Sequence, residues 1–115
     1  MDDSQTEWLN DGVTCIRGLL DARGRALAEL AFNWSLANPG PGAGEVLAGA
    51  EGAFYQDHAH PAAFEAYRPL ICDTGLARRV AQLMGSKNLW LLYEQIWLKE
   101  GAAARATRVR RLPRR

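Results

Sequence analysis

Histidine and cysteine are scarce in this chain of 115 residues, which contains two of each. No CxxC spacing is present, which argues against a disulfide or a reactive cysteine. Cys15 and Cys72 lie far apart in apolar contexts, and we expect both to be buried thiols. The two histidines, His58 and His60, fall in one short stretch.

Long apolar runs are also missing. No window approaches the roughly 20 apolar residues of a membrane-spanning helix. The first residues, MDDSQTE, are acidic, whereas a secretory signal begins basic and becomes apolar. These two absences predict a cytoplasmic protein with no membrane partner. At 115 residues and 48% hydrophobic content, the chain can bury one modest core, which excludes large multidomain enzymes.

Acidic residues are absent from the last fifteen positions, which carry six arginines. Residues 1–100 hold all 13 acidic residues against eight basic ones. We interpret residues 108–115 as a disordered basic tail that is read out of frame, because a GC-rich message in the wrong frame encodes mainly Arg, Ala, Pro, Gly and Leu. The alternative is a small non-catalytic binding protein whose arginine-rich tail contacts nucleic acid or another anionic partner.

The dominant pattern is a strand over residues 88–100, NLWLLYEQIWLKE, which mixes aromatic and branched residues without Gly or Pro. With a period of two, Glu94 and Ile96 share one face, while Tyr93, Gln95 and Lys99 share the other. Polar groups therefore interrupt apolar ones on both faces. Such a strand either lines a ligand pocket or lies in a core where its polar groups find ordinary hydrogen bonds.

Helices and shorter strands are expected before this segment. Residues 12–18 predict a first strand, and residues 53–57 a short one. Asp21 is a plausible N-cap for a helix that residues 38–42 end. Pro61 suits the first turn of another helix, which Pro69 should break or kink. The inward stripe of the helix after Asp21 is Leu27, Leu30, Ala31 and Trp34.

One further helix completes the pattern. Asp73 or Thr74 should cap it, and Gly85 stands where a C-terminal glycine would. Its inward stripe is Leu76, Val80, Leu83 and Met84. The intervening residues 38–52 predict a loop, and their glycines lack the Lys-Ser/Thr of a phosphate-binding loop.

Three segments resemble the N-terminal part of the phytanoyl-CoA dioxygenase family. They are DGVTCIRGLLD at 11–21, YRPLICDTGLARRVAQLMGS at 67–86 and LWLLYEQIWLKEG at 89–101. The resemblance covers nearly all of residues 7–107. It implies an α+β fold, with N-terminal helices and the first strands of a jelly-roll that is incomplete here. Members are non-haem iron(II), 2-oxoglutarate-dependent oxygenases that hydroxylate small organic substrates.

The resemblance also implies where chemistry would lie. The family places a side chain near 2-oxoglutarate and iron at the position of Gln95, and Tyr93 and Lys99 share its face. The iron ligands come from a His-x-Asp motif shortly after the strand and a later histidine. This chain has no histidine after His60. We therefore expect residues 1–107 to be a truncated, inactive part of such a dioxygenase domain that binds no cofactor itself.

Two weaker expectations remain. Asp57, His58 and His60 form the only dense cluster of metal-type side chains, but their order differs from the family motif, and a polar loop is the favoured interpretation. A jelly-roll cut after its first strands would leave open edges and apolar surface, so we also expect poor stability, aggregation or self-association.

Overall fold

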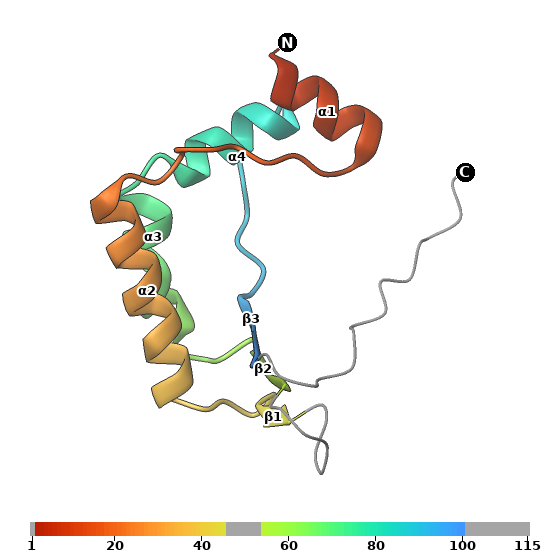
Figure 1. The fold of residues 1–115 in the computed structure, drawn as a ribbon. Coiled ribbons are helices and arrows are strands. Elements are labelled where there is room, and N and C mark those ends of the chain that lie inside the picture. Colours follow the sequence, from red (N-terminus) through yellow and green to blue (C-terminus); the bar gives the residue numbers. More distant parts are fainter. Residues whose placement is uncertain (1, 46–53, 101–115) are drawn as a thin grey trace.

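The structure is a computed structural model that describes residues 2–45 and 54–100. It is a mixed α+β arrangement of four helices and a small three-stranded antiparallel sheet (Figure 1). The predicted tail at 108–115 lies outside the described residues. The elements are α1 (Asp3–Asp11), α2 (Ala22–Ala37), β1 (Gly44–Glu45), β2 (Phe54–His58), α3 (Ala63–Cys72), α4 (Leu76–Met84) and β3 (Gln95–Lys99).

Side-chain caps begin the two N-terminal helices. The Asp2 carboxylate accepts a hydrogen bond from the Gln5 N–H at 2.9 Å and starts α1. Gly12 ends α1 in the left-handed conformation, with a φ of 72°. The Asp21 carboxylate accepts from the Gly24 N–H at 2.8 Å, so the predicted N-cap of α2 is confirmed. No strand forms over residues 12–18, and that prediction is wrong.

An ion pair joins α1 to α4. Arg79 on α4 donates to the Asp2 carboxylate at 2.7 Å, and Gln5 Nε2 donates to the Gln82 carbonyl at 3.2 Å. The Arg79 hydrogen bond, followed by the hydrogen bond from the Gln5 N–H, lowers the pKa of Asp2 below its usual 3.8. The N-terminal helix is thus attached through a group whose charge depends on pH.

Acid should loosen this attachment. The folded-state pKa of Asp2 lies below the unfolded value, so its contribution to stability is present above about pH 4 and is lost as the pH falls through the folded value. Amide hydrogen exchange of α1 should therefore accelerate, relative to intrinsic rates, between pH 6 and pH 3. Asp2→Asn keeps a capping side chain but removes the charge, so its α1 protection should change much less over this range. Equal pH dependence in both proteins would contradict the role of the pair.

The next two helices pack side by side (Figure 1). Ser35 on α2 is only 3% exposed, and its hydroxyl shares a 2.8 Å hydrogen bond with the Tyr67 hydroxyl on α3. The helix expected to start at Pro61 begins at Ala63 instead, and it continues through Pro69 to Cys72. Small residues make the close contact possible, since Ala31 of α2 and Ala63 of α3 are both buried.

Removing the Tyr67 hydroxyl should destabilise this pair of helices. Tyr67→Phe leaves the buried Ser35 hydroxyl without this partner, and we expect a loss of about 1–2 kcal/mol in the free energy of unfolding. Chemical denaturation followed by circular dichroism measures it. Tyr93→Phe is the control, because Tyr93 is exposed and should change the value by less than about 0.5 kcal/mol. Equal effects of the two variants would contradict the assignment.

The last helix differs from expectation at its start and agrees at its end. Gly75, not Asp73 or Thr74, occupies the N-cap of α4, although the Thr74 hydroxyl accepts the Leu76 N–H at 3.2 Å. Gly85 ends the helix in the left-handed conformation, as predicted. Met84 is exposed, so the predicted inward stripe is wrong at that position.

The sheet has the order β1-β2-β3, with both pairs antiparallel. The short strand predicted at 53–57 is confirmed as β2. The long strand predicted at 88–100 is wrong in extent, because β3 covers only Gln95–Lys99. Residues 86–94 instead connect α4 to the sheet without regular secondary structure (Figure 1). The missing length has a physical reason: β2 ends at His58, so a longer β3 would find no described partner strand beyond it.

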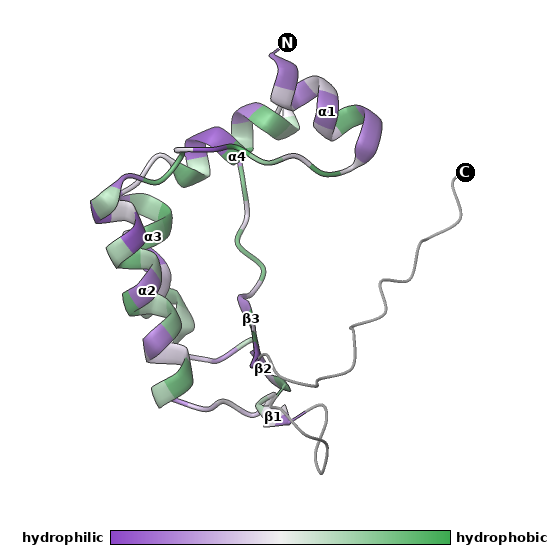
Figure 2. Ribbon diagram, viewed as in Figure 1, coloured by the Kyte–Doolittle hydropathy of each residue, from purple (hydrophilic) through white to green (hydrophobic). Residues whose placement is uncertain are grey.

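The core of the described part is small. Its buried apolar residues are Ala31, Ala63, Leu83 and Ile96, and none of its large side chains is fully buried. Apolar segments remain at the surface, notably the connection into β3 (Figure 2). Leu30 is also exposed, against the stripe predicted for α2. Both cysteines are exposed free thiols, so the prediction of buried thiols is wrong.

None of the four described helices combines the length and the apolar character needed to cross a bilayer.

Candidate functional site

The strand register divides the sheet into two faces. Directly opposed residues of antiparallel strands point to the same face, and β2 pairs His58 with Gln95, Gln56 with Trp97 and Phe54 with Lys99. These six side chains form what we call the open face. The inner face carries the alternate residues, which are Tyr55, Asp57, Ile96 and Leu98.

The inner face is organised by a buried carboxylate. Asp57 is 3% exposed, and its two carboxylate oxygens accept from the Gly40 N–H and the His58 N–H, both at 2.8 Å. A Cβ on Gly40 would lie 2.9 Å from the His60 ring, so glycine permits this close approach. Asp57 thereby fixes the loop after α2 against β2.

Tyr55 also belongs to the inner face. Its hydroxyl is buried and has no hydrogen-bond partner among the described residues. Burial first, and the nearby carboxylates of Asp57 and Glu45 second, raise the pKa of Tyr55 above its usual value. The phenol therefore stays neutral at physiological pH.

The open face contains two of the three residues singled out from the sequence. Gln95 and Lys99 both lie on it, exposed, with Trp97 between them at 63% exposure. Four residues along a strand separate their Cα atoms by about 13 Å. Tyr93 precedes the strand, and its ring meets His58 edge-on at a centroid distance of 6.4 Å. The structure thus places Tyr93 at the His58 end of the same face.

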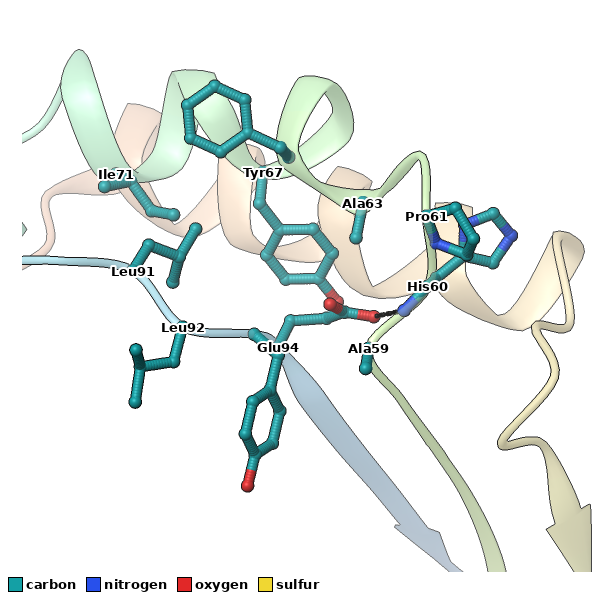
Figure 3. A pocket seen from close by; sticks show the side chains of 11 residues that line it. Ala59, His60, Pro61, Ala63, Tyr67, Ile71, Leu91, Leu92 and Glu94 are labelled. Carbon is teal, nitrogen blue, oxygen red and sulfur yellow. Dashed lines mark hydrogen bonds between the residues drawn. The ribbon is translucent and has the colours of Figure 1, made fainter.

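A separate groove of about 320 Å³ lies between α3 and the segment that leads into β3 (Figure 3). The Glu94 carboxylate accepts from the His60 N–H at 2.9 Å at one end of it. Leu91 points toward Ile71 of α3 (Figure 3), and Leu92 also lines the groove. Apart from Glu94, His60 and Tyr67, the lining is mostly apolar, so the groove lacks the cluster of charged groups that a dicarboxylate would need.

The two histidines do not fit the iron site of the resembled family. The His60 ring accepts the Ala62 N–H at its Nδ1 atom at 2.9 Å and packs edge-on against Trp34 at 4.8 Å. Both oxygens of Asp57 are engaged by backbone N–H groups. No group of three potential metal-ligating side chains occurs within residues 2–45 and 54–100. A facial arrangement of two histidines and a carboxylate therefore cannot be built from this cluster without breaking those contacts.

Sequence reasoning missed the three residues that β2 contributes to the open face, Phe54, Gln56 and His58. His58 stood out only as a metal-type side chain, and Gln56 not at all. The signal was the alternation of Phe54, Gln56 and His58 at a period of two, but only the register with β3 shows that they share a face with Gln95.

Comparison with known proteins gives no match for this chain among protein-family models, curated proteins or solved structures.

Proposed function

We propose that this chain is the N-terminal part of a phytanoyl-CoA dioxygenase-like domain, and that the 115 residues alone do not catalyse the reaction. In that proposal the sheet is the start of a jelly-roll, and its open face is the wall that would line the cofactor pocket of the completed domain. Full-length members of that family are oxidoreductases that use iron(II) and 2-oxoglutarate.

One observation carries the proposal, namely the open face itself. A sheet face that combines Gln95, His58 and Lys99 with Trp97, all four exposed, has the composition of a ligand wall, in which a few polar groups orient a ligand among apolar ones. An ordinary solvent-facing side would carry mainly charged residues and few large aromatics. The sequence resemblance places Gln95 on this same wall.

The absence of suitable ligands in the sequence supports inactivity of the chain alone. Both of its histidines lie before β3, and the contacts of His60 and Asp57 suit packing, not coordination. The described residues could therefore help to position a ligand, but they could not hold the metal. The side-chain NH₂ of Gln95 can donate a hydrogen bond to a carboxylate, and Lys99 can offset the charge of that carboxylate.

A turnover assay tests the proposal that the 115 residues alone are inactive. The purified 115-residue chain, supplied with iron(II), ascorbate, oxygen and 2-oxoglutarate, should form succinate no faster than a no-protein control. A His58→Ala variant should behave in the same way. Succinate formation that depends on the chain and falls in the variant would contradict the proposal, because it would require a metal site built from these residues.

A companion experiment tests the assignment of the open face. In a longer chain that restores the metal ligands, Gln95→Ala should raise the KM for 2-oxoglutarate by about tenfold, the effect of one lost hydrogen bond to a charged group. Glu65→Ala, on the exposed side of α3, is the control and should leave the KM unchanged. An unchanged KM in the Gln95 variant would remove this residue from the site.

A further inference from the structure

Exposed large apolar side chains are concentrated in β3 and in the segment that leads into it. Trp90 is 86% exposed, Leu92 is 85% exposed, and Leu89, Leu91, Tyr93 and Trp97 are exposed as well. An aromatic side chain has roughly 150–250 Å² of surface and a leucine somewhat less, so the three aromatic residues and three leucines together expose on the order of 700 Å². One partner of a standard protein interface buries about 800 Å².

Trp97 of β3 is one of these exposed residues, and its strand forms an outer edge of the described sheet. Among the described strands, β3 pairs only with β2. The Ala59 N–H donates to the Glu94 carbonyl at 3.0 Å, so Glu94 directs its carbonyl toward β2. In an antiparallel ladder the backbone groups alternate in direction from one residue to the next. Ile96 and Leu98 therefore also face β2, and the backbone groups of Gln95 and Trp97 point outward.

We infer that the outer edge of β3 pairs antiparallel with β3 of a second copy of this chain, around a two-fold axis at Gln95. The two three-stranded sheets then form a single six-stranded sheet. Both copies contribute the same edge, as a symmetric interface requires. This inference goes beyond the proposed function and does not depend on it.

Charge selects among the possible registers. An axis at a hydrogen-bonded pair must lie at a residue whose backbone groups point outward, which leaves Gln95 and Trp97 as the candidates. An axis at Trp97 would place Glu94 opposite Glu100 of the other copy, and like charges directly opposed destabilise a sheet. The axis at Gln95 avoids this pair. It also sets Tyr93 opposite Trp97 of the second copy, twice by symmetry, and each aromatic pair adds attraction beyond its buried area.

The oligomeric state of the chain, and a variant that blocks the outer edge of β3, test the inference. The 115-residue chain should sediment as a dimer at about 100 µM. Gln95→Pro removes an outward N–H, a position where an edge strand tolerates proline, so the monomer should keep its circular dichroism spectrum. The dimer dissociation constant of this variant should rise roughly tenfold to a hundredfold, because two hydrogen bonds across the axis are lost.

Cysteine cross-linking tests the register. In a Cys15→Ser, Cys72→Ser background, Gln95→Cys should form a disulfide dimer on mild oxidation, because hydrogen-bonded partners have Cα atoms about 5.5 Å apart. The matched control is Lys99→Cys, whose two copies would lie about 27 Å apart and should not cross-link. A wild-type monomer at 100 µM, a mixture of larger aggregates, a dimer unaffected by Gln95→Pro, or cross-linking through Lys99→Cys would each overturn the inference.

Discussion

Replacing Asp57 with alanine is expected to lower the free energy of unfolding by about 3 kcal/mol. Asp57 is buried, and its carboxylate accepts two backbone hydrogen bonds, from Gly40 and His58. Each hydrogen bond to a charged group contributes about 1.5–3 kcal/mol, and the alanine leaves both donors without this acceptor. Urea denaturation followed by circular dichroism measures the loss.

Two further variants separate this effect from a general loss of charge. Asp57→Asn keeps the shape but retains only one acceptor oxygen, so its loss should fall between the wild type and Asp57→Ala. Glu29→Ala removes an exposed carboxylate from α2 and should change stability by less than about 0.5 kcal/mol. Equal losses for Asp57→Ala and Glu29→Ala would show that Asp57 does not hold the loop.

Truncation of Leu83 should have a comparable effect. Leu83 is the buried residue of α4, the helix that contacts both α1 and α3. Leu→Ala in a core typically costs about 2–5 kcal/mol, and we expect the lower half of that range because the core is small. Thermal or urea unfolding of Leu83→Ala gives the value.

The neighbouring residue supplies the control for this prediction. Met84 lies on the same helix, one position away, and is 55% exposed. Met84→Ala should therefore lower stability by less than about 1 kcal/mol. If both variants lost the same amount, the orientation of α4 would differ from the one described here.

The helices were largely predictable because their ends are encoded locally. Asp21 caps α2 through its own side chain, and Gly85 ends α4 by adopting a left-handed conformation. Both signals act within one turn of the helix and need no tertiary context. Pro69 was predicted to break or kink its helix, and the break is wrong, because α3 continues through the proline to Cys72.

The strands were less predictable because a strand needs a partner. Residues 88–94 have the composition of β structure, yet only Gln95–Lys99 pairs with β2. Residues 12–18 likewise carry β-branched side chains, but they lie between two helices and pair with none of the strands in the described part of the chain. β-propensity describes how well a residue suits a sheet surface, and it does not supply that surface.

The candidate site was also predictable only where its pattern is local in the sequence. The alternation of Tyr93, Gln95 and Lys99 was visible in the sequence, and the structure places Gln95 and Lys99 on one face with Tyr93 at its end. The register that adds His58 and Gln56 to that face depends on contacts between distant segments. Burial also depends on such contacts, which is why the exposure of Cys15 and Cys72 was not foreseen.

The most direct test of the proposed origin is to read the encoding DNA in its other two frames beyond codon 107. If the chain is the first part of a dioxygenase-like domain, one of those frames should encode a Trp-His-x-Asp run close to that codon, followed further on by another histidine. If neither frame contains such a run, the out-of-frame interpretation of residues 108–115 is wrong, and the proposed relationship to iron(II) oxygenases loses its main support.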